Sequence, residues 1–295
     1  MSKNSYGATS ALIQNEPTAA ASLREFSFSD EDFKGLAKLA YEHAGIALSD
    51  AKRNLVYSRL SRRLRVLQLQ TFREYRELVA NDAREIENFI NSISTNHTKL
   101  FREDHHFDHL RTRVAAPFAQ AGARAGSLRI WSAGCSSGEE PYTIAVVLKR
   151  ELRSFQNRDV KILATDIDTE ILSKAARGEF APNATADVPH GYQSFFKSVV
   201  VNGQEKVTVD EDVRSLITFR RLNLMERWPF RGLFDAIFCR NVMIYFDGPT
   251  KANLLERFAN QLKPGGWLYI GHSESLTGNH PQLKPVGRTI YRRAE

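Results

Sequence analysis

The sequence predicts an α/β fold in which a parallel sheet follows a small all-α domain. From Phe26 to about Ser94 the chain has only helical patterns, whereas beyond about residue 128 short β-rich runs alternate with helical ones. Alternation of this kind is typical of a parallel sheet with helices on both faces. The expected strands are Leu128–Ser132, Val160–Thr165, Ile217–Arg220, Phe234–Phe238, Trp267–Gly271 and Thr289–Arg292, and the expected helices are Pro141–Leu152, Thr169–Arg177 and Pro249–Leu262.

The expected domain boundaries follow these changes of pattern. Residues 1–22 are polar and rich in small side chains, which is typical of a disordered tail. We expect a helical domain over residues 23–98, a linker and connecting helix over 99–127, and the sheet domain over 128–295. Two valine-rich runs flank Asn202-Gly203, a dipeptide that favours a type I′ turn. This pattern predicts an antiparallel β-subdomain inserted at about residues 190–215.

Local signals mark the helix ends of the first domain. Three pairs have the spacing of a capping box or a close variant: Ser29 with Asp32, Thr71 with Glu74, and Asp82 with Glu85. Gly45 suits the end of the first helix, since glycine readily adopts the left-handed conformation that ends helices. These signals predict separate, well-defined helices in this region.

Composition indicates a cytoplasmic globular protein. Hydrophobic residues make up 42% and charged residues 25% of the chain, and no apolar run approaches the roughly 20 residues of a membrane span. The N-terminus lacks the pattern of a secretory signal, so Cys135 and Cys239 are expected to be reduced thiols. The net charge of +7 favours an acidic partner, either nucleic acid or an acidic protein surface.

The stretch from Trp131 to Thr143, WSAGCSSGEEPYT, is the most informative part of the chain. A strand, a tight loop with Gly134 and Gly138, and a helix N-terminus together form a nucleotide-recognition unit. Glu139 and Glu140 stand where a pyrophosphate binder would leave the helix N-terminus free for phosphate. Acids at this place favour a ligand with hydroxyls and positive charge, and S-adenosyl-L-methionine is such a ligand.

Polar side chains follow several of the other expected strands. Asp166 ends the second strand, where an acid can accept hydrogen bonds from both ribose hydroxyls, while Asp168 is placed to cap the next helix. Asn223 and Asn241 also follow strands, and their amides can both donate to and accept from an adenine edge. Either asparagine can instead be an ordinary turn residue.

The junction of the two domains, TNHTKLFRE, adds further polar groups. Asn96, Thr98 and Arg102 are expected on a loop, and a domain junction is a common place for a ligand. The Arg102 guanidinium can hold a carboxylate substrate in a fixed orientation, or it can form a surface salt bridge with Glu103 or Asp104. His105 and His109 have the i, i+4 spacing of a zinc pair, but no third ligand is evident nearby, so we expect no metal.

A basic helix is expected from about Asp50 to Leu67. Apolar residues at Val56, Leu60, Leu64 and Leu67 form one stripe, and the other faces are positively charged. The charges can form a solvated face, but their excess over the single Asp50 favours docking on an acidic surface. The basic residues are Lys52, Arg53, Arg59, Arg62, Arg63 and Arg65.

Four motifs together resemble the chemotaxis receptor protein-glutamate O-methyltransferases of the CheR type. They are TNHTKLFRE, SAGCSSGEEPY, ATDIDTEIL and FCRNVMIYF, and LKPGGWLYIGHSES adds to them. The resemblance covers about Phe26 to the C-terminus. It implies a Rossmann-like S-adenosylmethionine-dependent methyltransferase domain with an inserted antiparallel β-subdomain, preceded by a small all-α domain.

The resemblance also implies roles for particular residues. Arg102 would orient the incoming carboxylate, and Tyr245 would line the methyl-transfer site. The basic helix would meet methyl-accepting receptors at Lys52, Arg53, Arg59, Arg62 and Arg63, and the β-subdomain would be the place for a receptor's C-terminal tether. The implied contacts to S-adenosyl-L-methionine are Asn96, Thr98, Arg102, Glu140, Asp166, Asn223, Leu224, Asn241 and Val242.

Two other classes of function remain to be weighed. A nucleic-acid methyltransferase would need aromatic residues interleaved with the basic patch for base stacking, and the basic helix offers only Tyr57. A non-catalytic receptor-binding module would be indicated by loss of Asp166 or of the glycine loop, and both are present. We therefore expect no nucleic-acid partner and no direct insertion into membranes.

Overall fold

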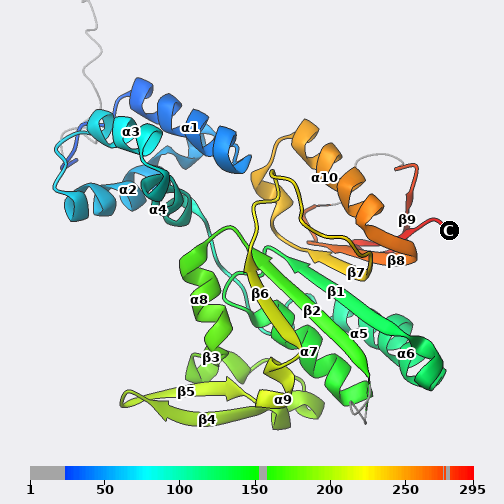
Figure 1. The fold of residues 1–295 in the computed structure, drawn as a ribbon. Coiled ribbons are helices and arrows are strands. Elements are labelled where there is room, and N and C mark those ends of the chain that lie inside the picture. Colours follow the sequence, from blue (N-terminus) through cyan, green and yellow to red (C-terminus); the bar gives the residue numbers. More distant parts are fainter. Residues whose placement is uncertain (1–23, 153–157, 275, 277–279) are drawn as a thin grey trace, which may run out of the picture.

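The computed structural model describes residues 24–152, 158–274, 276 and 280–295, and the tail predicted over residues 1–22 lies outside them. A helical domain packs beside a sheet domain, and a small second sheet lies at the far end of the latter (Figure 1). The predicted α/β class is confirmed. None of the described helices is long and apolar enough to cross a bilayer.

The helical domain consists of α1 (Asp30–Ala44), α2 (Arg53–Leu67), α3 (Phe72–Asn81) and α4 (Ala83–Ile93). Ser29 and Thr71 form the predicted capping boxes, and Gly45 ends α1 with a φ of 68°. Asp82 caps α4, but Glu85 turns inward to Arg63 instead of completing a box. The apolar stripe of α2 packs in the core of this domain, which it shares with side chains of the other three helices.

The main sheet has the strand order β6-β2-β1-β7-β8-β10-β9. The five strands from β6 to β8 are parallel, whereas β10 runs antiparallel to β8 and to β9. Strand β9 had no counterpart among the expected strands. The bounds are β1 (Ser127–Ala133), β2 (Asp159–Asp166), β6 (Ile217–Arg221), β7 (Phe234–Cys239), β8 (Leu262–Ile270), β9 (Leu283–Gly287) and β10 (Ile290–Arg293).

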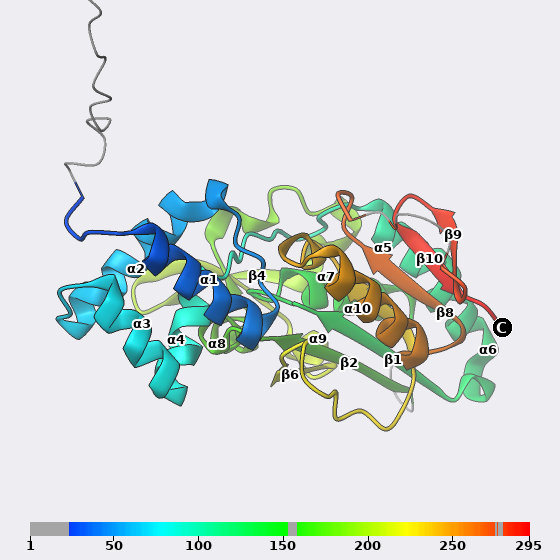
Figure 2. The same cartoon turned by 90° about the horizontal axis from the view of Figure 1, so that it is seen from above.

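Helices cover both faces of this sheet, because successive residues of a strand point to opposite sides. Ile130 of β1 packs with α5 (His105–Leu110), α6 (Ala116–Ala121) and α7 (Glu139–Glu151), while its neighbour Trp131 packs against α10 (Gly248–Gln261). Figure 2 shows α10 lying across the front of the sheet. Helix α8 (Thr169–Arg177) lies on the same face as α7. The segment expected as a linker and connecting helix over 99–127 has apolar side chains in the same core cluster as β1.

The second sheet has the order β3-β5-β4. Its strands are β3 (Glu179–Phe180), β4 (Phe196–Val201) and β5 (Gln204–Val209), and the short α9 (Glu211–Arg214) follows. Asn202 and Gly203 have φ values of 51° and 75°, so both residues adopt the positive φ of the predicted type I′ turn. The expected hairpin is present, and β3 extends the subdomain to residues ahead of the expected start at about 190.

Candidate functional site

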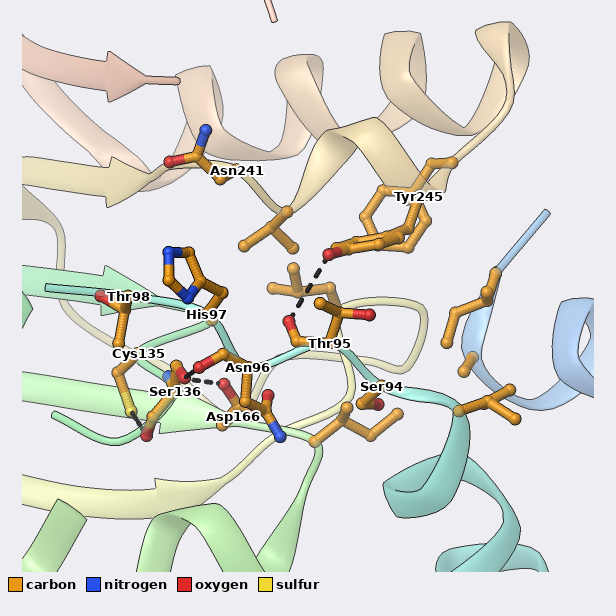
Figure 3. A pocket seen from close by; sticks show the side chains of 18 of the residues that line it. Ser94, Thr95, Asn96, His97, Thr98, Cys135, Ser136, Asp166, Asn241 and Tyr245 are labelled. Atoms are coloured by element: carbon orange, nitrogen blue, oxygen red, sulfur yellow. Dashed lines mark hydrogen bonds between the residues drawn. The ribbon is translucent and has the colours of Figure 1, made fainter. Parts of the chain in front are cut away.

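A pocket lies where the helical domain meets the carboxyl ends of β1, β2, β6 and β7. The order of the sheet reverses between β1 and β7, and ligands of open α/β sheets bind at such a switch point. Figure 3 shows side chains from both domains turned toward this space. All ten residues predicted for catalysis or cofactor binding line it: Asn96, Thr98, Arg102, Glu140, Asp166, Asn223, Leu224, Asn241, Val242 and Tyr245.

The loop after β1 forms the floor of the pocket. The amides of Gly134 and Cys135 donate to the Thr165 carbonyl over 2.8 and 2.9 Å. Gly134 has a φ of 79°, and a Cβ there would lie 2.4 Å from a methyl group of Val242, so only glycine lets the two loops approach. Gly138 does not line the pocket; its absent side chain instead makes room for Ala175 of α8 and for Tyr142.

Asp166 and Asp168 have different partners, and the predicted cap at Asp168 is present. Asp168 caps α8 by accepting hydrogen bonds from the amides of Glu170 and Ile171. Asp166 accepts from the amides of Ser136 over 2.8 Å and of Asp168 over 3.0 Å. Burial raises the pKa of Asp166 to about 6, although these two hydrogen bonds oppose the shift.

Glu140 lies at the start of α7 with both carboxylate oxygens engaged. It accepts from the Ser132 hydroxyl over 2.7 Å and from the Arg240 guanidinium over 3.0 Å. Burial raises the pKa of Glu140, and the positive charge of Arg240 opposes that effect. Glu139 instead accepts from the Ser137 hydroxyl and does not line the pocket.

The domain junction contributes Asn96, Thr98 and Arg102 to the pocket wall. The side-chain amide of Asn96 donates to the Asp168 carboxylate over 2.7 Å, and the backbone carbonyl of Asn96 accepts from the Ser136 hydroxyl. Arg102 donates to the His97 carbonyl over 3.0 Å. No salt bridge joins Arg102 to Glu103 or Asp104 among the described residues, so the surface salt bridge considered as an alternative for Arg102 is not formed.

The two predicted asparagines differ in how free their amides are. Asn223 donates to the His43 carbonyl of the helical domain over 2.6 Å and accepts from the Met225 amide over 3.0 Å. It therefore serves as a turn residue that joins the domains, and the predicted adenine contact would have to share its amide. Asn241 has a φ of 59°, and Figure 3 shows its side chain at the edge of the pocket.

Glu274 supports the Asn241 turn and was not among the site residues predicted from the sequence. Its carboxylate accepts from the amides of Asn241 and Gly271, each over 2.7 Å, and from the Ile244 amide over 3.0 Å. Glu274 lies in the GHSES part of the fifth motif, and this position in a shared motif was the only available signal.

Tyr245 and Lys52 approach each other from different domains. The Tyr245 hydroxyl lies 3.5 Å from the Thr95 carbonyl, and the Lys52 ammonium lies 5.1 Å from the centre of the tyrosine ring. Burial lowers the pKa of Lys52. Lys52 thus lines the pocket rather than the outer surface of the helical domain.

Several of the arginines expected to dock on a receptor are paired with other groups of this chain. Arg59 donates to the carbonyls of Ile93 and Ser94. Arg63 forms a two-pronged ion pair with buried Glu85, and Arg53 pairs with Asp30. Arg62 is exposed. The docking role stays a prediction, and Arg62 is the exposed one among the five basic residues for which it was predicted.

The three histidines of α5 form separate hydrogen bonds within the fold. His105 lies 3.2 Å from the Arg288 carbonyl, His106 lies 2.9 Å from the Thr289 hydroxyl, and His109 lies 3.0 Å from the Tyr269 hydroxyl. No group of possible metal ligands converges among the described residues.

The fold and the pocket define a class of protein: an S-adenosylmethionine-dependent methyltransferase. The chain matches the family "CheR methyltransferase, SAM binding domain" over residues 96–292 and "CheR methyltransferase, all-alpha domain" over residues 31–94. It belongs to the CheR methyltransferase family, so the resemblance and the cofactor predicted from the sequence are confirmed.

Named relatives support the same assignment. The chain is 46% identical to a probable chemotaxis protein methyltransferase of Rhizobium etli, over 86% of this chain and 96% of that protein. It is 42% identical to chemotaxis protein methyltransferase 2 of Pseudomonas aeruginosa, over 93% and 97% of the two chains. It is 40% identical to the chemotaxis protein methyltransferase of Escherichia coli, over 97% and 96%.

Proposed function

We propose that this protein transfers a methyl group from S-adenosyl-L-methionine to glutamate side chains of methyl-accepting chemotaxis receptors. The products would be glutamate methyl esters and S-adenosyl-L-homocysteine. The observation that carries the proposal is the pocket itself, which is lined by Asp166, Glu140 and Arg102 together. Acids suited to a cationic nucleoside are thus combined with a guanidinium suited to a carboxylate substrate.

The acceptor groups and apolar side chains of the pocket suit the cofactor. A carboxylate has about four acceptor positions, and Asp166 uses two of them on backbone amides, so two remain for ribose hydroxyls. Leu224 and Val242, which line the pocket, would supply apolar surface for an adenine ring, and Asn241 would meet its edge. Glu140 would offset the positive charge of the methionine part. When bound, the cofactor supplies a methyl group activated by a positively charged sulfur.

The residues of the chain have mainly to position and desolvate the reactants. A glutamate side chain is already ionised at neutral pH, since its unperturbed pKa is about 4.3. The carboxylate can attack without a general base, so rate enhancement would come from orientation and from exclusion of water. Arg102 would orient the carboxylate, and Tyr245 would line the transfer site beside Lys52.

The receptor would be met by surfaces of both domains. Exposed Arg62 would recognise acidic receptor helices, and Lys52, which lines the pocket, would attract the glutamate itself. The β-subdomain formed by β3, β4 and β5 would be the place for a receptor's C-terminal tether. Action on the cytoplasmic helical region of receptors implies that the protein works in the cytoplasm.

Methyl transfer to a receptor fragment tests the proposal. Full-length protein and S-adenosylmethionine with a labelled methyl group are incubated with a cytoplasmic receptor fragment, and the product is treated with mild base. We expect the label to be released as volatile methanol, because carboxyl esters are base-labile. Label that stays on the protein after base, or transfer to nucleic acid in its place, would overturn the proposal.

A further inference from the structure

The backbone around Arg102 has an unusual conformation. Phe101 and Glu103, on either side of Arg102, have φ values of 53° and 57°. Positive φ is uncommon for residues other than glycine, and two such residues in one turn persist only if the surroundings hold them. The turn is short and ends where α5 begins at His105. It determines where the Arg102 side chain enters the pocket.

Three contacts from distant parts of the chain hold this turn. The Phe101 amide donates to the Thr143 hydroxyl over 3.2 Å. The Glu103 carboxylate accepts from the His272 ring over 3.0 Å. The Arg102 carbonyl accepts from the Arg240 guanidinium, which approaches from the end of β7. Arg240 therefore contacts the backbone of the very residue that points into the pocket.

Arg240 also contacts the cofactor side of the pocket. Its other terminal nitrogen donates to Glu140 over 3.0 Å, and the guanidinium lies 3.4 Å from the Glu103 carboxylate. The Arg240 side chain is only 2% exposed and stacks over the ring of Phe107. A rigid, forked guanidinium is the one side-chain group that can span two such acceptors in fixed geometry.

This cluster does not have the form of an arrangement made for stability alone. The Nε atom of Arg240 is buried without a hydrogen-bond partner among the described residues. The Oε2 atom of Glu103 forms no hydrogen bond there either, although it lies 3.4 Å from the Arg240 guanidinium and 3.6 Å from the Nδ1 atom of His106. Buried charges with unsatisfied atoms are costly, and apolar residues of similar volume are often more stabilising. A functional reason for the cluster is therefore worth testing.

We propose that Arg240 is a positioning residue that joins the cofactor-facing Glu140 to the backbone of Arg102. Its guanidinium holds the turn from Phe101 to Glu103 in the conformation that presents Arg102 to the substrate carboxylate. The proposal rests on the proposed function, because it assigns Arg240 to the same transfer reaction. Arg240 itself acts through Arg102 rather than on the reacting atoms.

Replacement by lysine separates charge from geometry. Arg240→Lys keeps a positive charge beside Glu140, but a single ammonium cannot bridge Glu140 and the Arg102 carbonyl with the same geometry. We expect kcat for methylation of a receptor fragment to fall about 100-fold, since a displacement of about 1 Å at a reacting group can cost that much. The KM for S-adenosylmethionine and the melting temperature should change little.

A matched control is Arg158→Lys. Arg158 also donates to backbone carbonyls, of Gly122 and Ala119, and also lies over an aromatic ring, of Phe118. It does not line the pocket. We expect this variant to keep the wild-type kcat, which would show that loss of a partly buried arginine contact to backbone carbonyls is not sufficient for the effect.

A double-mutant cycle shows whether Arg240 acts through Arg102. In the Arg102→Lys background, adding Arg240→Lys should lower kcat by less than threefold, because the group that Arg240 positions has been replaced. Hydrogen exchange should also show faster exchange at the Phe101 amide in Arg240→Lys than in the wild type or Arg158→Lys.

The outcomes separate this inference from the proposed function. A wild-type protein that does not form base-labile esters on the receptor fragment contradicts the proposed function, whatever the exchange data show. The positioning role of Arg240 is overturned if Arg240→Lys keeps the wild-type kcat and exchange. It is also overturned if the fold-losses of kcat caused by Arg240→Lys and Arg102→Lys multiply fully in the double variant. The same holds if the loss of kcat in Arg240→Lys is accompanied by loss of folding and of cofactor binding.

Discussion

Replacement of Asp166 by asparagine tests how the pocket holds its cofactor. The two oxygens of Asp166 accept from the Ser136 and Asp168 amides, which leaves about two acceptor positions for ribose hydroxyls. Asparagine keeps one oxygen and places an NH2 group where the other was. Loss of one hydrogen bond to a charged group costs about 1.5–3 kcal/mol, which corresponds to a roughly 10- to 150-fold higher Kd.

The pH dependence gives a second signature of the same residue. Burial raises the pKa of Asp166 to about 6 from the reference value of 3.8. Only the ionised carboxylate accepts from both hydroxyls, so Kd should rise by about tenfold for each pH unit below about 6. In Asp166→Asn this group no longer titrates, and the corresponding part of the pH dependence should disappear.

The effect of Asp166 on stability has the opposite sign. Because its folded-state pKa is raised, its contribution to the free energy of unfolding is fully present below about pH 3.8 and is lost as the pH rises through about 6. Cofactor affinity should therefore improve over the same interval in which this contribution to stability declines. Acid unfolding would instead make the cofactor affinity and the free energy of unfolding fall together as the pH is lowered.

Titration calorimetry with S-adenosyl-L-homocysteine, from about pH 5 to about pH 8, measures these effects. The matched control is Asp159→Asn, which makes the same substitution at the opposite, exposed end of β2, where Asp159 pairs with Arg129. We expect the control to bind like the wild type. If Asp166→Asn binds within about twofold of the wild type and with the same pH profile, the assignment of Asp166 to the ribose is wrong.

Three further predictions concern other parts of the site. Tyr245→Phe removes a hydroxyl that lies 3.5 Å from the Thr95 carbonyl. We expect steady-state kinetics to show a kcat about 10-fold lower and an unchanged affinity for the cofactor. A change confined to the KM for the cofactor would contradict this. Arg62→Glu should weaken receptor binding without altering stability. Arg63→Met should lower the free energy of unfolding by about 3–5 kcal/mol in a urea titration, because it leaves the charge of Glu85 buried and unpaired. Equal stability of the two variants would refute this distinction. Glu274→Gln places a donor against one of three backbone amides, so calorimetry should show about tenfold weaker cofactor binding, and wild-type affinity would show that the Asn241 turn holds without it.

The sequence predicted those parts of the fold and site that depend on local patterns. Strand ends could be located from apolar runs, and parallel strands bring their carboxyl ends to one edge, so Asp166, Asn223 and Asn241 were expected to lie near one another. The structure places them around one pocket. The cap at Asp168 was also predictable, because it involves residues only two and three positions away.

Contacts between distant residues could not be predicted in this way. The Asn223 amide is used by the His43 carbonyl, which is 180 residues away in the chain. The inward direction of Arg63 depends on Glu85, which lies on another helix. Helical periodicity identifies polar positions but not their partners, so a helix that looked uniformly basic proved to have few free charges.

The central claim is that this pocket esterifies receptor glutamates. Tandem mass spectrometry of a cytoplasmic receptor fragment, after incubation with the full-length protein and S-adenosylmethionine, tests it most directly. We expect methyl groups on glutamate side chains alone, and far fewer of them when Arg102→Lys replaces the wild type. Methyl groups on lysine, arginine or the chain terminus, or undiminished glutamate methylation by Arg102→Lys, would contradict it.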